Sequence, residues 1–318
     1  MRVFVTGGVG YIGTKLIEKL LLNDIKVKCW DNLTFGLSPL SDFLNHPNFE
    51  LEEGDIRNHN RITGFMFDCD ACIHLAAMVF QGGEELKNQI MEVNYNATRH
   101  LADVCKNMGM KFIFTSTCSN YGVSKEVVDE HSPLQVNSPY SESKIKAEKY
   151  ITNNYPEATI LRLSTAFGLS PKMRFDLTIN EMTRDAVMKK KIEIYNPEAW
   201  RPSLHLDDIT DVLIRSLQKD VMGIYNVGHE SMNYQKKKLG EILQNSIPGL
   251  KIKIVEKGDP RDYRVSFEKI KRDLHFRPRR TIEYGTFEII RALHQGVFKN
   301  PYDIKYQNLE VYKNEGNI

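Results

Sequence analysis

The sequence predicts a doubly wound α/β fold: a parallel sheet, with a smaller α/β lobe interleaved with it toward the C-terminus. Two observations support this prediction. Short apolar runs alternate with amphipathic stretches through the first half of the chain, and the glycine-rich segment Thr6–Gly13 joins the first run to the first amphipathic stretch. Strands separated by helices imply right-handed crossovers and a parallel sheet. The order of strand, glycine turn and helix is that of a Rossmann fold.

The first strand, Met1–Val5, leads into a turn with glycines at every third place, and the helix that follows ends near Leu22. Glycine permits a tight turn, a close approach of the backbone to an anion, and packing of the helix on the strand. A dinucleotide pyrophosphate would lie at the helix N-terminus. The residues expected to bind this cofactor are Gly7, Gly10, Tyr11, Ile12 and Gly13.

The second strand, Ile25–Trp30, ends at Asp31, where a Rossmann fold places an acid. A carboxylate there accepts hydrogen bonds from both ribose hydroxyls and repels a 2′-phosphate, so the sequence favours NAD over NADP as the cofactor. We assign the neighbouring Asn32 to the same site. The alternative is that Asp31 only caps a loop.

The third strand, Asn48–Glu52, is followed by Gly54-Asp55-Ile56, and the fourth begins at Ala71. We expect Asp55 to bind the adenine amino group, with Ile56 beside it, although Asp55 alone is also typical of a helix cap. The fourth strand leads toward the cofactor through Leu75, Ala76 and Ala77. Cys69 and Cys72 lack a second pair that would complete a zinc site, so we interpret them as buried and expect no metal.

Composition is that of a water-soluble enzyme of 318 residues, with 41% hydrophobic residues and a net charge of +2. The 43 basic and 41 acidic residues are spread along the chain, which argues against nucleic acid as a partner. No apolar stretch approaches the ~20 residues of a membrane span. The five cysteines are odd in number and show no disulfide pattern, as expected in the cytoplasm.

The strongest chemical motif is Tyr140-Ser141-Glu142-Ser143-Lys144, at the start of a helix that is predicted over Pro139–Asn154. A spacing of four places Tyr140 and Lys144 on one helix face. We expect the ammonium group to lower the pKa of the phenol, which would make Tyr140 a general base near neutral pH. Lys144 would also hold the nicotinamide ribose.

A strand over Lys111–Phe114 runs into Thr115-Ser116-Thr117-Cys118-Ser119, so hydroxyl groups lie at the carboxyl end of a parallel strand, where α/β proteins bind ligands. With these motifs the chain resembles the extended short-chain dehydrogenase/reductase family, in its nucleotide-sugar epimerase/dehydratase branch. The resemblance covers nearly the whole chain. It implies a catalytic set of Thr117, Tyr140 and Lys144, in which Thr117 binds the sugar C4 hydroxyl.

The resemblance also implies a division of the chain. Residues 1–165 form the NAD-binding Rossmann domain, to which a segment near 200–225 returns, and residues 166–318 mainly bind a nucleotide-diphosphate sugar. Thr115 and Asn94 belong to the cofactor site, although Asn94 is equally suited to bracing neighbouring strands. The residues assigned to the substrate by the resemblance are Thr117, Cys118, Thr165, Arg174, Asn180, Arg201 and Arg261.

Arginine suits a diphosphate because its planar fork of donors binds two oxygens at once. Surface ion pairs are the alternative for Arg201 and Arg261. Asp207 and Asp208 are interpreted as the cap of the following helix, and His205 as part of local packing.

Departures from subfamily patterns narrow the reaction. The resemblance implies an acid after the catalytic hydroxyl residue in sugar 4,6-dehydratases and in decarboxylating relatives, where this chain has Cys118 and Ser119. The fucose-pathway 3,5-epimerase/reductases use a cysteine where this chain has Ser119. A 4-epimerase of surface-polysaccharide sugar synthesis is therefore the leading hypothesis. A 4-dehydrogenase or 4-ketoreductase, for example one acting on a GDP-heptose, and a non-catalytic NAD sensor or scaffold remain as alternatives.

The helices predicted over Glu92–Met108 and Tyr140–Asn154 resemble the pair through which relatives dimerise. On this basis we expect a homodimer, with a mass near twice 36.7 kDa. Their apolar residues are equally able to face only their own sheet.

Overall fold

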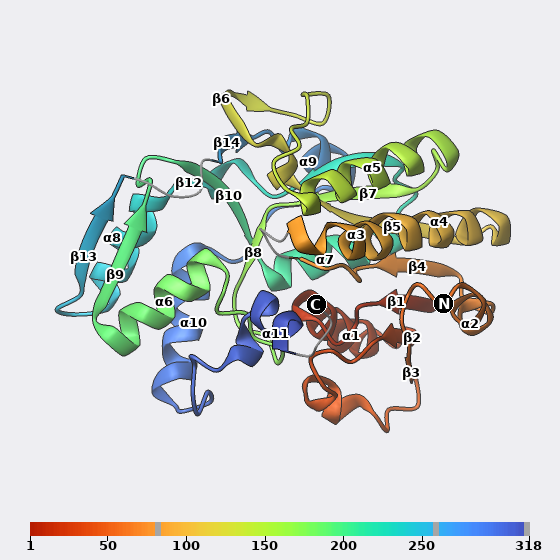
Figure 1. The fold of residues 1–318 in the computed structure, drawn as a ribbon, viewed down its shortest axis with the longest axis horizontal. Coiled ribbons are helices and arrows are strands. Elements are labelled where there is room, and N and C mark those ends of the chain that lie inside the picture. Colours follow the sequence, from red (N-terminus) through yellow and green to blue (C-terminus); the bar gives the residue numbers. More distant parts are fainter. Residues whose placement is uncertain (80–83, 257–260, 315–318) are drawn as a thin grey trace.

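The computed structural model describes residues 1–79, 84–256 and 261–314. Its centre is a seven-stranded sheet in the order β11-β7-β5-β4-β1-β2-β3, in which every neighbouring pair is parallel (Figure 1). The strands are β1 Arg2–Thr6, β2 Lys26–Asp31, β3 Phe49–Glu53, β4 Ala71–His74, β5 Lys111–Thr117, β7 Thr159–Leu163 and β11 Gly223–Val227. This topology confirms the predicted doubly wound fold.

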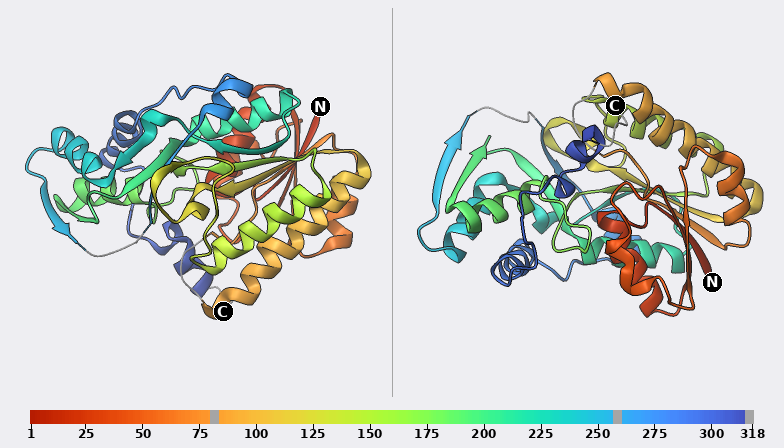
Figure 2. Two further views of the ribbon diagram at one scale, coloured as in Figure 1. Left: turned by 90° about the horizontal axis from the view of Figure 1, so that it is seen from above. Right: turned by 60° about the horizontal axis from the view of Figure 1, so that its bottom comes forward.

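Helices cover both faces of this sheet, as the views in Figure 2 show. They are α1 Tyr11–Leu22, α2 His59–Met66, α4 Ala97–Met108, α5 Pro139–Asn154 and α7 Leu206–Gln218. Side chains alternate along a strand, so Val3 and Val5 of β1 share a core with α1 and α7, whereas Phe4 shares one with α2, α4 and α5. Within the described residues no helix has the length and apolar character needed to span a bilayer.

The structure changes some predicted boundaries. The helix expected over Glu92–Met108 begins earlier, with α3 Lys87–Met91, and passes through a π-helical segment, Glu92–Asn96, before α4. Strand β5 continues three residues beyond Phe114, to Thr117. Strand β6 Val123–Val128 leaves the main sheet and pairs with β14 Asp262–Val265, so the two halves of the chain cross.

The C-terminal lobe lies at the left of Figure 1, and its strand β8 pairs with β10 rather than with the main sheet. Its elements are β8 Thr165–Phe167, α6 Thr178–Lys189, β9 Lys191–Tyr195, β10 Trp200–His205, β12 Asn233–Gln235, α8 Lys236–Ser246, β13 Lys251–Val255 and α10 Ile282–His294. Outside this lobe, α9 Glu268–Leu274 packs in the core shared by β1, α1 and α7, and α11 Asn308–Asn314 follows near the C-terminus. Strand β11 returns from this half to the edge of the main sheet. The domain boundaries given above stay a prediction.

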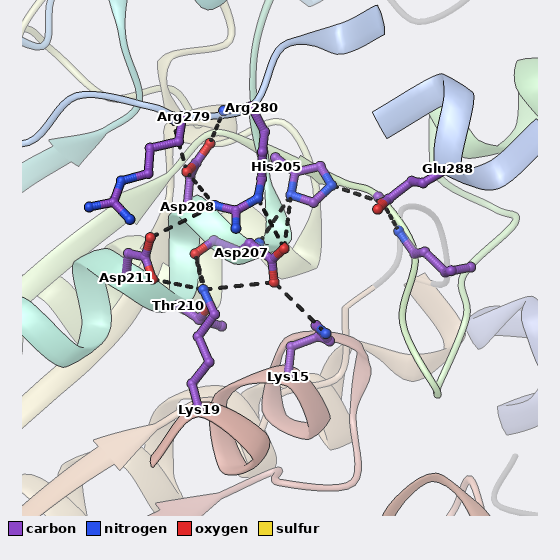
Figure 3. Close-up of polar contacts among 12 residues, drawn as sticks. Lys15, Lys19, His205, Asp207, Asp208, Thr210, Asp211, Arg279, Arg280 and Glu288 are labelled. Atoms are coloured by element: carbon purple, nitrogen blue, oxygen red, sulfur yellow. Dashed lines mark hydrogen bonds and ion pairs between the residues drawn. The ribbon is translucent and has the colours of Figure 1, made fainter. Parts of the chain in front are cut away.

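A polar network ties α1 to α7 and to the segment before α10 (Figure 3). Lys19 donates to the backbone oxygen of Asp207, at 2.6 Å, and to the Asp211 carboxylate, at 2.7 Å. The fully buried Asp208 accepts the backbone N–H groups of Arg279 and Arg280. The first helix of the sheet is thereby fixed against the C-terminal half.

The cap of α7 differs from the prediction. His205, rather than either aspartate, is the N-cap, and its Nδ1 accepts the Asp207 N–H. Its other ring nitrogen lies 2.8 Å from Glu288 of α10 (Figure 3). Asp207 and Asp208 lie in the first helical turn, where carboxylates interact favourably with the helix dipole.

His74, at the end of β4, gives the fold an acid-sensitive point. Its ring lies between the hydroxyl groups of Thr6, at 2.6 Å, and Thr98, at 2.8 Å. Burial and the nearby Lys144 charge lower the pKa of His74 from 6.5 to about 3. The unfolded chain therefore binds a proton below about pH 6.5 that the folded chain refuses, and stability falls as the pH falls through this range.

We expect His74→Gln to reduce this acid sensitivity. Between about pH 6.5 and 5 the wild type should lose about 2 kcal/mol through this one group, because each pH unit corresponds to about 1.4 kcal/mol. Urea unfolding at both pH values measures the difference. An equal loss of stability in wild type and His74→Gln would contradict the assignment.

Candidate active site

A cavity of about 810 Å³ opens at the carboxyl ends of β1, β2, β4 and β5. It is lined at one end by the glycine turn after β1 and at the other by arginines of the C-terminal lobe. The predicted cofactor residues that line it are Gly7, Gly10, Tyr11, Ile12, Gly13, Asp31, Asn32, Asp55, Ile56, Leu75, Ala76, Ala77, Thr115, Tyr140 and Lys144. The predicted substrate residues that line it are Thr117, Thr165, Arg174, Arg201 and Arg261.

The glycine turn has the shape that a dinucleotide requires. Gly7 has φ +72°, and a Cβ there would lie 2.7 Å from the backbone nitrogen of Ala76. A Cβ on Gly13 would lie 2.3 Å from the oxygen of Gly7. Helix α1 starts at Tyr11 with Gly10 as its N-cap, and no side chain caps it. Its first N–H groups therefore face the cavity as donors for a pyrophosphate.

We expect Gly7→Ala to weaken NAD binding by about tenfold or more, because the new methyl group pushes the turn away from Ala76 and α-left-handed backbone is strained for alanine. Equilibrium dialysis with NAD measures the loss. Gly64→Ala is the matched control, since Gly64 lies exposed in α2 with no atom within 4 Å of a new Cβ. Equal NAD affinity in the two variants would contradict this account of the turn.

Asp31 is held in place at the end of β2. Its two carboxylate oxygens accept the N–H groups of Val9 and Leu33, both at 2.9 Å, and the residue is 8% exposed. Burial raises the pKa of this carboxyl, and the two backbone bonds oppose the rise. Each oxygen keeps a lone pair for a ribose hydroxyl. The residues present therefore fit NAD.

Asp55 lines the cavity with its carboxylate already engaged. Arg57 binds it through Nε, at 2.9 Å, and Nη2, at 2.6 Å, and this pairing lowers the pKa of Asp55 against the opposing effect of its burial. Adenine would therefore have to share this carboxylate with Arg57, a residue that the sequence does not predict at the site.

The three expected catalytic residues lie together along the cavity wall. Thr117 ends β5, and Tyr140 and Lys144 lie one turn apart in α5. The helix starts where predicted because Ser138 and Ser141 form a capping box and Pro139 occupies the first turn. The Thr117 hydroxyl lies 2.8 Å from that of Ser119, which also lines the cavity.

The predicted lowering of the Tyr140 pKa by Lys144 is wrong. Burial raises the pKa of Tyr140 to about 12, and the groups that oppose this rise are Arg174, Arg261 and Thr117. The Lys144 ammonium instead lies 4.3 Å from the centre of the Phe114 ring, and its own burial lowers the pKa of Lys144 to about 7. Desolvation of Tyr140 thus outweighs the positive charges of Arg174 and Arg261.

The substrate end of the cavity carries guanidinium groups from three segments. Arg174 forms a two-point ion pair with Asp176, at 3.0 and 2.8 Å. Arg201, at the start of β10, is 7% exposed and donates to the backbone oxygen of Arg261. Arg261 and Thr165 complete this wall. Three guanidinium groups at one end of a cavity, one of them buried, favour an anionic ligand such as a diphosphate.

Three predicted site residues do not reach the cavity. Asn94 is fully buried and binds the backbone of Met78 and the Ser143 hydroxyl, so it braces the structure. Cys118 is also fully buried, with its sulfur 3.1 Å from the backbone oxygen of Arg162. Cys118 begins a short 3-10 helix directly after β5, and its side chain packs in the hydrophobic core rather than at the cavity.

Asn180 is the third, and it acts behind the cavity wall. Its oxygen accepts the Gly168 N–H, at 3.1 Å, and its amide donates to the Tyr11 hydroxyl and to the backbone oxygen of Arg174. The Tyr11 hydroxyl in turn donates to the Gly168 oxygen, at 2.7 Å. Asn180 therefore joins the cofactor turn to the Arg174 loop, and its assignment to the substrate stays a prediction.

The sequence reading missed the part of the cavity wall formed by α11. The cavity is lined there by Asn308, Leu309 and Tyr312, together with Phe35, which follows β2. No local pattern marks these residues, because their contacts are with segments far away in the sequence. Among the described residues, no three histidine, cysteine or acidic side chains are grouped as metal ligands, and all five cysteines are free and buried.

Comparisons with known proteins agree with this geometry. The model of the NAD dependent epimerase/dehydratase family matches residues 3–228. UDP-glucuronic acid decarboxylase 5 of Arabidopsis thaliana is 27% identical over 94% of this chain and 92% of its own.

Two solved structures share the fold. The dTDP-glucose 4,6-dehydratase of Bacillus anthracis in complex with NAD has a TM-score of 0.82 at 24% identity, covering 94% of this chain and 98% of its own. The UDP-glucose 4-epimerase of Thermotoga maritima with UDP-glucose has a TM-score of 0.82 at 23% identity, covering 94% and 100%.

Proposed function

Since this chain belongs to the NAD-dependent epimerase/dehydratase family, we propose that it is a nucleotide-sugar 4-epimerase that uses NAD. The observation that carries the proposal is the set of acids around the cavity. Among the described residues that line it, the carboxylates are Asp31, Asp55 and Asp176. The first two lie at the cofactor end, and Asp176 is paired with Arg174.

No described carboxylate therefore lines the cavity beside Thr117 and Tyr140. Elimination of water across C5 and C6 needs general acid and base groups there in addition to the tyrosine. Serine occupies the nearest polar position, since Ser119 lies beside Thr117. This argues for a reaction that needs only the removal and return of hydrogen at C4.

In this reaction bound NAD would supply the acceptor and the donor of the C4 hydride. Thr117 binds the C4 hydroxyl, and Tyr140 takes the hydroxyl proton. After the ketone has rotated so that its other face meets the nicotinamide, Tyr140 returns the proton. Lys144 holds the nicotinamide ribose from the same helix face. Arg174, Arg201 and Arg261 bind the diphosphate, which leaves the sugar free to rotate about its link to the phosphate.

A 4-dehydrogenase or 4-ketoreductase is the second candidate, because the same three catalytic residues perform half of the epimerase cycle. A non-catalytic NAD-binding protein has less support, because all three residues lie along one cavity wall. The sequence resemblance suggests a role in surface-polysaccharide synthesis, with a GDP-heptose as one candidate substrate, and a homodimer formed through α4 and α5.

The test supplies the purified protein with a panel of GDP-, UDP-, CDP- and dTDP-sugars. Reduced nicotinamide is followed by its near-ultraviolet absorbance, and the sugar products are identified. An inverted C4 without net NADH supports the epimerase, whereas NADH together with a 4-keto sugar supports the dehydrogenase. A product that has lost water or carbon dioxide overturns the proposal.

A further inference from the structure

The C-terminal helix α11 lies across the cofactor end of the cavity. The rings of Tyr312 and Phe35 meet edge to face, with 6.1 Å between their centres, and both residues line the cavity. Helix α11 also packs, through Leu309 and Tyr312, on a cluster of Met78, Leu86 and Ile90. The right-hand view of Figure 2 shows α11 beside the start of the α3–α4 helix, as these contacts require.

Sheet topology fixes what α11 crosses. Phe35 lies four residues after the end of β2, and Met78 lies four residues after the end of β4. Strand β1 lies between these two strands in the sheet order β4-β1-β2. Helix α11 contacts Phe35 and packs on the cluster that includes Met78, so we infer that it passes above the end of β1, beside the turn with Gly7 and Gly10 that would receive the pyrophosphate.

The start of α11 is anchored to the substrate side. Asn308 is 7% exposed; its side-chain oxygen accepts Lys172 Nζ at 2.8 Å, and its N–H donates to Asp176, at 3.3 Å. Lys172 Nζ also lies 3.7 Å from the centre of the Phe35 ring. The chain before α11 is held too, since Phe175 donates its N–H to the Tyr306 oxygen, at 3.0 Å.

We propose that Phe35 and Tyr312 close over the pyrophosphate of NAD and retain the cofactor on the protein between catalytic cycles. This proposal deepens the proposed function, on which it rests for the meaning of a cycle. A retained cofactor suits an epimerase, because each cycle returns NAD to its starting state. For a dehydrogenase, the reduced cofactor would have to be oxidised again in place.

The test measures NAD release without any sugar, so its outcome is independent of the reaction catalysed. Protein loaded with radiolabelled NAD is diluted into excess unlabelled NAD, and the retained label is followed with time. Phe35→Ala and Tyr312→Ala should each speed release by about tenfold, because each removes the aromatic pair and its buried area. The double variant should fall short of the product of the two effects, since both act on one contact.

Lys313→Ala is the matched control, because Lys313 is exposed on the same helix and pairs only loosely with Glu310, at 3.6 Å. Phe35→Leu, which keeps apolar bulk, serves if Phe35→Ala does not fold. Release at the wild-type rate from the Phe35 and Tyr312 variants overturns the retention proposal. A failure of the sugar panel with unchanged retention would instead count against the proposed function alone.

Discussion

Tyr140→Phe should lower kcat by about a thousandfold or more, because positioned general acid–base groups contribute about 10²–10⁴. The variant loses only the phenolic oxygen, which is the atom proposed to exchange a proton with the C4 hydroxyl. NAD binding should change little, because the glycine turn and Asp31 are untouched. Single-turnover kinetics and NAD dialysis measure the two effects separately.

Tyr150→Phe is the matched control on the same helix, since its hydroxyl binds the Asp103 carboxylate, at 2.8 Å, outside the cavity. It should keep wild-type turnover. Because burial raises the pKa of Tyr140 to about 12, the fraction of phenolate increases with pH, and activity should rise with pH across the neutral range. Turnover surviving in Tyr140→Phe would show that another group takes the proton.

Glu148→Ala should lower the free energy of unfolding by about 3–5 kcal/mol, the largest stability effect expected here, because it leaves a buried guanidinium without its partner. Glu148 binds Arg162 through Nη2, at 2.7 Å, and Nε, and the two side chains are 3% and 4% exposed. The Glu148 carboxylate raises the pKa of Arg162. Glu148 also accepts the Ser116 hydroxyl, so the loss extends to the strand that carries Thr117.

Denaturant unfolding measures this loss. Glu142→Ala, on the exposed side of α5, removes pairs with Lys87 and Lys146 and should cost less than about 1 kcal/mol. Replacing both partners, as Glu148→Leu with Arg162→Met, should cost less than Glu148→Ala alone, since no charge is then left buried. A double variant as unstable as Glu148→Ala would show that packing, rather than the unpaired charge, causes the loss.

The main sheet and its helices could be predicted from the sequence because local signals agree with the tertiary structure. Helix α5 is the clearest case: Pro139 marks its start, Tyr140 and Lys144 have helical spacing, and its observed bounds match the prediction. The sequence predicts β5 three residues too short. The polar Thr115-Ser116-Thr117 segment lacks the apolar pattern of a strand, and its strand conformation is evident only from its pairing with β7.

Burial also limits what the sequence predicts at the site. The resemblance assigns Asn180 and Cys118 to the substrate, which stays a prediction; the structure shows both side chains buried behind the cavity wall and bonded to the backbone. The pKa of Tyr140 depends on desolvation, which spacing along a helix does not reveal. The position of α11 at the cavity depends on contacts with Phe35 and with the cluster that includes Met78. Both lie more than two hundred residues away in the sequence, and no local pattern encodes these contacts.

The bonds among Tyr11, Gly168 and Asn180 bear on attempts to graft the loop of residues 168–180 between relatives. The Tyr11 hydroxyl donates to the Gly168 oxygen and accepts from the Asn180 amide, which also holds the Arg174 oxygen. A graft of residues 168–180 into a scaffold with phenylalanine at the Tyr11 position would leave buried polar groups unsatisfied. The loop and residue 11 therefore depend on each other, and a chimaera has to exchange them together.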